Sequence, residues 1–436
     1  MNKILTAVLL FAALAANAQT VTTTTCGGEP PRRQLRPHAT LEEAAADASD
    51  GNRYIVPLKE WRRSEEGGKT RFTAEFVNPA SWLNRQILVR TESASSGYTV
   101  EIGGTVAGSV RSGSEPAEFN ITKLAKQGIN TISVILDNPS SNEPLLRSDV
   151  AWLGLTEIVS QPTIRVRDID SRTTLNDAGD AVFEVAIVVK SDALNAKQAR
   201  ISYDLWNDYD HLTSGYKDVS LSMRGEDTVR FVAVIPKELL WSSERPTLLD
   251  LVIRNKIEGR YAENIVEHVG VREVKYEENT LKVNGKEETL RVRTVAPNLT
   301  VEELRQMKES GCNAVTVEAG EAAAGLYAAC DAAGVYVIPQ LAVDTSNGGR
   351  SIKKFGNAGN DPSLTAEYLT RTRAMYHRAK SHPSVVAFSL GNGVANGINT
   401  YESYLLIKGE DSSRPVVYVG ANKEWNNDPF DLRFGK

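Results

Sequence analysis

Cysteine and long apolar runs are scarce in this 436-residue chain. The three cysteines, Cys26, Cys312 and Cys330, are too few for a scaffold held together by disulfides. Cys312 and Cys330 lie in apolar helical surroundings, which predicts buried small hydrophobes rather than reactive thiols. After the N-terminus, no apolar run reaches the roughly 20 residues that a membrane-spanning helix needs, so we expect no transmembrane segment.

Excess positive charge and metal-ligand spacings are also missing. The formal net charge is −5, which gives no electrostatic surface for nucleic acid or an anionic membrane. The five histidines show no spacing typical of metal ligands, and the glycine-rich loops lack the lysine of a phosphate-binding loop. We therefore expect no nucleic-acid partner, no metal and no cofactor.

The N-terminus has the features of a secretory signal peptide. Lys3 precedes a short apolar run that ends in a small-residue cleavage pattern at Ala18. These features predict that residues 1–18 are removed on export and that the mature protein is periplasmic or secreted.

The remaining sequence changes character three times. Residues 19–50 lack periodicity and are predicted to be a flexible leader with one short helix near 41–46. Residues 51–160 and 161–274 contain short strands separated by turns, which is typical of β-sandwiches. Residues 275–436 alternate strands with amphipathic helices, so the fold class is multidomain β plus α/β.

The α/β part is short for a closed barrel. A complete (β/α)₈ barrel takes about 250 residues, so this part has room for roughly five of the eight strands. An open sheet of this kind leaves edges that need covering. The expected strands are residues 290–295, 314–317, 335–341, 385–390 and 416–419, and the expected helices are residues 301–310, 322–332, 364–380 and 401–408.

Three segments carry a resemblance to a known family. Residues 382–393 read HPSVVAFSLGNG, residues 240–248 read LWSSERPTL and residues 269–274 read VGVREV. They resemble segments of glycoside hydrolase family 2, the β-galactosidase and β-glucuronidase group. The resemblance implies a jelly-roll sugar-binding-like domain, then an immunoglobulin-like sandwich, then a partial TIM-barrel-like glycosidase domain truncated within the barrel.

The same resemblance points to a missing catalytic group. In the family, a glutamate follows the Gly-Asn pair of this strand and is the catalytic acid/base; here the position is Gly393. An arginine and a histidine that usually follow the second barrel strand are also absent. Because general acid/base help is worth about 10²–10⁴-fold, the resemblance implies a pseudoenzyme or a gene fragment.

Three polar residues near strand ends are the remaining candidates in the barrel. Glu318 and Asp344 follow neighbouring strands and are weak candidates for a relocated acid/base pair, although solvated carboxylates are the commoner case. The family resemblance gives Asn392 a contact with a sugar hydroxyl, and a turn without ligand is an equal alternative.

Tryptophans are the candidate sugar platforms outside the barrel. Trp82 and Trp206 have polar neighbours and are the candidates for exposed platforms, although a position in the core is favoured for any single tryptophan. Trp152 and Trp241 occupy family packing positions and are expected in the core.

Three functions stay open at this point. The first is an exported, catalytically degenerate family 2 homologue that binds carbohydrate or acts as an interaction module. The second is an active exo-β-glycosidase that uses relocated carboxylates. The third is a structural or assembly protein without sugar affinity, whose open barrel edge pairs with a protein partner or a second copy of the chain.

Overall fold

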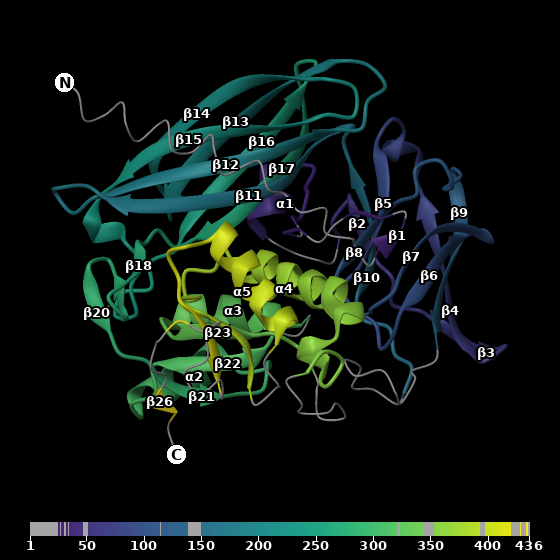
Figure 1. The fold of residues 1–436 in the computed structure, drawn as a ribbon. Coiled ribbons are helices and arrows are strands. Elements are labelled where there is room, and N and C mark those ends of the chain that lie inside the picture. The colour runs from purple at the N-terminus through teal and green to yellow at the C-terminus, as the bar shows by residue number, and fades with distance from the viewer. Residues whose placement is uncertain are drawn as a thin grey trace.

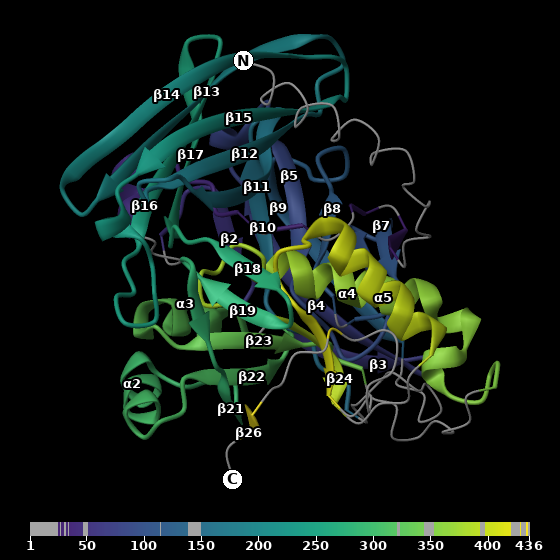
Figure 2. The ribbon, with the colours of Figure 1, turned by 60° about the vertical axis from the view of Figure 1, so that its left-hand side comes forward.

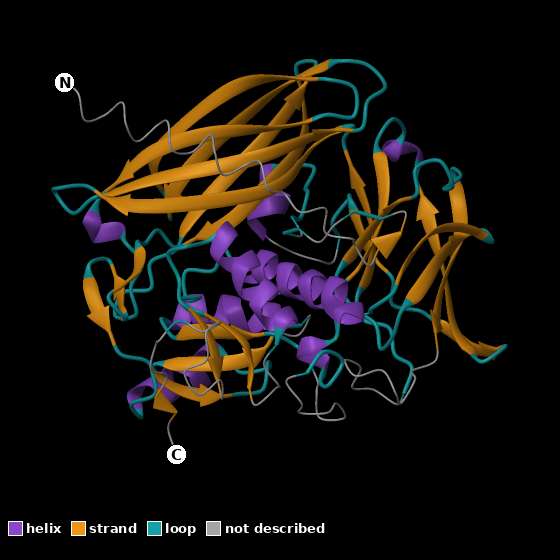
Figure 3. Cartoon of the chain, in the orientation of Figure 1, coloured by secondary structure: helices purple, strands orange, loops and turns teal. Residues whose placement is uncertain are grey.

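The computed structural model contains two β units and one α/β unit (Figures 1 and 3). In Figure 1 the first β unit is purple to blue, the second is teal, and the α/β unit is green to yellow. The predicted signal peptide lies outside the described residues. The structure describes residues 25–26, 28–29, 32–33, 35–46, 51–113, 115–137, 150–320, 323–343, 353–392, 397–419, 428 and 433–434.

The first β unit consists of two antiparallel sheets around one apolar core. The six-stranded sheet has the order β1 (Thr25–Cys26), β7 (Thr105–Val110), β6 (Tyr98–Ile102), β9 (Gly128–Asp137), β4 (Lys69–Asn78), β3 (Arg62–Glu66). The four-stranded sheet has the order β2 (Ile55–Pro57), β10 (Thr156–Gln161), β5 (Gln86–Thr91), β8 (Ala117–Asn120). Alternate side chains of both sheets, such as Val100, Phe119 and Val134, point inward and are 0% exposed. A 3-10 turn, η1 (Ala80–Trp82), precedes β5.

The second β unit has seven strands in two sheets. They are β11 (Ile164–Leu175), β12 (Ala181–Ser191), β15 (Glu226–Ile235) in one sheet and β14 (Asp210–Leu221), β13 (Lys197–Asn207), β16 (Leu249–Ile257), β17 (Arg260–Val269) in the other. Buried and half-buried residues alternate along all of β12, because one face of this strand meets the core. The strands expected from the alternating sequence pattern are therefore present, and a 3-10 turn, η2 (Lys237–Leu239), follows them.

The α/β unit begins with a small antiparallel sheet and continues as a parallel one (Figure 2). The small sheet contains β18 (Val274–Glu277), β19 (Thr280–Val283) and β20 (Lys286–Glu288). The parallel sheet has the order β25 (Val416–Val419), β24 (Phe388–Asn392), β23 (Tyr336–Gln340), β22 (Ala314–Glu318), β21 (Arg291–Thr294), β26 (Arg433–Phe434). The helices are α2 (Val301–Glu309), α3 (Ala323–Ala333), α4 (Thr365–Ala379) and α5 (Ile398–Glu410), with 3-10 turns η3 (Ala358–Asn360) and η4 (Pro362–Leu364).

The parallel sheet has one strand more than expected. All five predicted strands are present, and β26 pairs with the outer side of β21. The edge of β21, which the five-strand prediction leaves unpaired, is thus covered by residues of the same chain. A strand of two residues is too short to show a periodic pattern, so β26 could not be predicted from the sequence.

The described part of the predicted leader packs on both β units. Leu35 is 1% exposed and belongs to the core of the second unit. The backbone of His38 exchanges two hydrogen bonds with Asn264 of β17, and Glu29 pairs with Arg165 at 2.8 Å. The expectation of a flexible leader is therefore wrong for these residues, while the short helix α1 (Leu41–Ala46) lies where it was expected.

Helix α4 connects the three units (Figure 1). Arg378 pairs with Glu92 of the first β unit at 2.8 Å, and Lys380, just after the helix, pairs with Asp168 of the second at 2.9 Å. These partly and fully buried ion pairs fix the α/β unit against both β units. Over the described ranges, no helix is long and apolar enough to cross a bilayer.

Candidate functional site

The carboxyl edge of the parallel sheet gathers the polar strand ends. Glu318 closes β22 and is paired in register with Gln340, the last residue of β23. Gln340 is paired with Ser389 of β24, whose last residue is Asn392. Because all these strands run in one direction, Glu318, Gln340 and Asn392 end on the same side of the sheet.

The sequence candidates at this edge have different outcomes. Glu318 is exposed at the end of its strand. Asp344 and Gly393 lie outside the described residues, and only the backbone of Asn392 is described. The distance that would make Glu318 and Asp344 an acid/base pair is thus untested, and the pair stays a prediction.

The opposite edge of the sheet holds the HPS segment in a hydrogen-bonded cluster. One carboxylate oxygen of Asp331 accepts hydrogen bonds from the Ser384 backbone N–H at 3.0 Å and hydroxyl at 2.6 Å. Its other oxygen lies 2.5 Å from Nδ1 of His382. Asp331 therefore stands between serine and histidine and fixes the loop that leads into β24, and this arrangement lacks the serine–histidine contact of a nucleophilic triad.

The second β unit also reaches this loop. Arg272 donates hydrogen bonds to the carbonyl oxygens of Pro383, His382 and Val385, the last at 2.6 Å. A side chain at Gly270 would collide with the ring of Pro383, since a Cβ there would lie 2.5 Å from Cγ. The VGVREV segment thus packs directly on the HPS segment.

Arg414 supports the same loop from the other side. Its guanidinium donates to the carbonyl oxygens of Val385 and Lys380 and pairs with Asp411. Burial raises the pKa of Asp411, but the Arg414 charge and hydrogen bonds from Ser413 outweigh burial and lower this pKa to about 2. Asp411 is therefore ionised throughout the physiological range.

Asp331 and Arg272 were missed as individual site residues by sequence reasoning. Arg272 belongs to the VGVREV segment, but no local pattern shows that side chains about 50 and 110 positions away from the HPS loop contact it. The retained family segments meet at one cluster, which we call the HPS junction: Gly270, Arg272, Asp331, His382, Pro383, Ser384 and Arg414.

The tryptophans are distributed differently from the prediction. Trp82 is 3% exposed and its indole N–H donates to the Arg53 carbonyl, so it is in the core and its candidate role as an exposed platform is contradicted. Trp206 is half-buried on β13 against His211. Trp241 is fully buried as expected, whereas Trp152, expected in the core, is 43% exposed. Neighbouring polarity in sequence is a weak guide because the strand face decides burial.

Metal chemistry has no candidate in the described part of the chain, where no group of three or more His, Cys, Asp or Glu could hold an ion. Cys330 is buried, and burial raises the pKa of its thiol. The side chains of the HPS junction therefore hold one another in place.

Two β units followed by a parallel α/β unit define a multidomain β plus α/β protein. Two family models match this arrangement in order: glycosyl hydrolases family 2 over residues 164–272, and glycosyl hydrolases family 2, TIM barrel domain, over residues 283–431. Together they cover more than half of the residues, and the chain belongs to glycoside hydrolase family 2.

Curated relatives and solved structures agree with this assignment. A β-galactosidase of Yersinia pestis is 26% identical over 401 residues, covering 84% of this chain and 37% of the relative. A Bacteroides uniformis β-glucuronidase structure matches 90% of this chain and 52% of its own with a TM-score of 0.67 at 17% identity. A putative β-galactosidase of Bacteroides fragilis matches 80% and 55% with a TM-score of 0.65 at 16% identity. The chain spans about 37% of the length of the curated relative.

Proposed function

We propose that this chain is an exported family 2 homologue of carbohydrate metabolism that binds carbohydrate without hydrolysing it. The observation that carries the proposal is Gly393 directly after Asn392, where the family resemblance implies the acid/base glutamate. Glycine has no side chain that could transfer a proton to a leaving oxygen.

The HPS junction supports the proposal from the structural side. Its hydrogen bonds hold β24 between β23 and β25, so the strand that would present the acid/base group is kept in place. The contacts that position β24 are present, but the carboxylate that would follow Asn392 is not. This combination favours a binding role over catalysis by relocated carboxylates.

We infer that the two β units are a jelly roll and an immunoglobulin-like sandwich. Seven strands divided three and four between two sheets support the second assignment. The six- and four-stranded sheets support the first. The sequence features of residues 1–18 support export.

The test is a turnover assay on the purified chain with p-nitrophenyl β-D-galactoside, β-D-glucuronide and β-D-mannoside. We expect release no faster than in a mock preparation from an empty host, together with binding on a glycan array. Reproducible turnover above the mock would refute the inactive assignment.

Two variants separate the alternatives. If turnover is found, it should disappear in Glu318→Gln or Asp344→Asn if the chain is a glycosidase with relocated carboxylates. Glu302→Gln, on the exposed face of α2, is the control and should keep the turnover. A silent glycan array with a stable oligomer in light scattering would instead support an assembly protein.

A further inference from the structure

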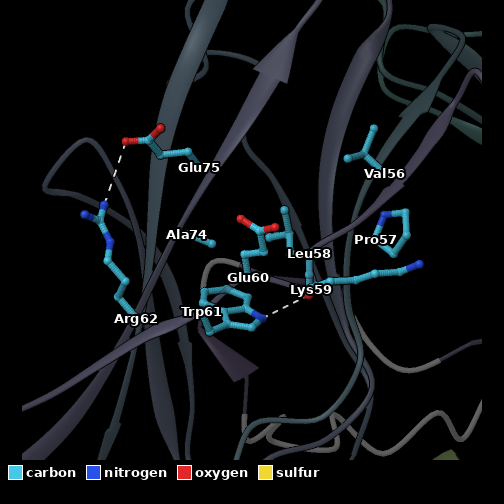
Figure 4. Close-up of a pocket in the computed structure, with 9 residues that line it drawn as sticks. All are labelled: Val56, Pro57, Leu58, Lys59, Glu60, Trp61, Arg62, Ala74 and Glu75. Carbon is cyan, nitrogen blue, oxygen red and sulfur yellow. Dashed lines mark hydrogen bonds and ion pairs between the residues drawn. The ribbon is translucent and has the colours of Figure 1, made fainter.

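A cavity of about 600 Å³ opens in the first β unit beside the end of β2 and the start of β3 (Figure 4). Its volume is in the range of small-molecule sites, which is about 300–1,000 Å³. Trp61 is the aromatic residue among the side chains that line it.

The indole of Trp61 is held in a fixed orientation. Its N–H donates to the Leu58 carbonyl at 3.0 Å, and its ring meets Phe72 edge-on, with centroids 6.5 Å apart and planes at 90°. Trp61 is half-buried, unlike Trp82, so part of its ring stays accessible after these contacts. A flat, immobilised and partly exposed ring can bind the apolar face of a sugar at little entropic cost.

Charged side chains of both signs line the same cavity. Lys59 and Arg62 bring two cations to the cavity, and Glu60 and Glu75 bring two carboxylates. Arg62 and Glu75 form an ion pair at 3.8 Å (Figure 4). The charges cancel, so an anionic ligand gains no net attraction, while a ligand rich in hydroxyl groups finds both donors and acceptors.

We propose that this cavity binds a neutral pyranose, stacked on Trp61 and hydrogen-bonded by the surrounding charged groups. The inference rests on the proposed carbohydrate-binding function and places that function in the first β unit. It also names the ligand class, which is a neutral sugar rather than a uronic acid.

The test uses saturation-transfer difference NMR on the purified full chain with four probes. They are the methyl β-D-pyranosides of galactose, glucose and mannose, and methyl β-D-glucuronide. We expect at least one neutral probe to bind more strongly than the glucuronide. Trp61→Ala should weaken this binding about tenfold, since about 1.4 kcal/mol of stacking corresponds to tenfold in affinity.

Matched variants control for folding and for tryptophan content. Trp152→Ala removes an exposed tryptophan of the same unit that does not line the cavity, and it should leave binding unchanged. Trp61→Phe keeps an aromatic ring against Phe72 and should retain part of the affinity. Glu60→Ala removes an exposed lining carboxylate and should weaken binding without unfolding the chain.

The outcomes separate this inference from the function on which it rests. Undiminished binding in Trp61→Ala and Glu60→Ala would overturn the cavity assignment and leave carbohydrate binding intact. Equal or stronger binding of the glucuronide would overturn the neutral-ligand assignment. No binding of any probe to the unmodified chain would contradict the carbohydrate-binding function itself.

Discussion

The side chains of the HPS junction have a structural role that does not depend on the missing acid/base group. Asp331 uses both carboxylate oxygens for His382 and Ser384, and Arg272 satisfies three carbonyl groups of the same loop. None of these contacts needs a substrate. Their energy comes from satisfying buried polar groups, and an unsatisfied one costs about 1–3 kcal/mol.

The Asp411–Arg414 pair makes the free energy of unfolding depend on pH. The pKa of Asp411 is about 2 in the folded chain, below its ordinary value of 3.8. The ionised pair therefore contributes fully above about pH 4 and loses its contribution as the pH falls toward 2. We expect Asp411→Asn to cost about 2 kcal/mol at pH 7, measured by urea unfolding.

The difference between the unmodified chain and Asp411→Asn should shrink between pH 4 and pH 2. A difference that stays constant over this interval would show that the variant acts by another route than loss of the ion pair.

Helix α3 offers two glycines whose replacement should act in opposite directions. Gly334 follows the last helical residue with a φ of 66°, and a Cβ there would lie 2.3 Å from the Ser243 carbonyl oxygen. Gly334→Ala should therefore destabilise the chain by about 2–4 kcal/mol.

Gly325 lies within the same helix, exposed, with open space where a Cβ would be. Gly325→Ala should stabilise the chain by about 0.5–1 kcal/mol, because alanine loses less entropy in a helix. Urea unfolding of both variants measures the two effects. Shifts of the same sign would contradict the proposed packing of the α3 C-terminus.

The elements with strong local signals were predictable from the sequence. The expected α2 at residues 301–310 is Val301–Glu309, with Thr300 and Glu303 forming a capping box. Glycine at position 334 marked the end of α3 correctly. The fourth barrel strand was placed three residues early, because Val385 makes only an isolated bridge to Val337 before β24 begins.

Long-range contacts were not predictable in the same way. The docking of Leu35, the burial of Trp82 and the role of Asp331 depend on partners far away in the sequence, which a single sequence does not reveal. The sequence did predict that the residues ending neighbouring parallel strands lie at one edge of the sheet, because such strands run in the same direction. The Trp61 cavity was not, because its shape results from β2 and the β3–β4 hairpin coming together.

Across the whole molecule, a buried ion network joins the N-terminal segment to both β units. Arg165 is 0% exposed and pairs with Glu118 at 2.9 Å and Glu29 at 2.8 Å. Burial raises the pKa of Glu118, but the charges of Arg90 and Arg165 outweigh it, so this pKa lies below its ordinary value.

Removing the central cation should destabilise the network. Arg165→Ala removes the cation that Glu118 and Glu29 share, but Arg90 still pairs with Glu118 and Lys190 with Glu29. The cost should therefore stay below the roughly 3–5 kcal/mol that a buried charge without any partner costs. We expect a lower thermal unfolding midpoint and faster proteolysis within residues 28–46. Arg200→Ala breaks an exposed pair with Asp218 and serves as the control, with no expected change in either measurement. Equal effects of the two variants would contradict a stabilising role for the ion pairs of Arg165.

The docked N-terminal segment also imposes an order on biosynthesis. His38 and Asn264 are 226 positions apart, so a ribosome adding about 5–20 residues per second needs roughly 10–45 s between them. During that interval Leu35 has no core to enter and stays available to chaperones or proteases. The first β unit can form early, but Leu35 and His38 reach their final positions only after the second unit has been synthesised.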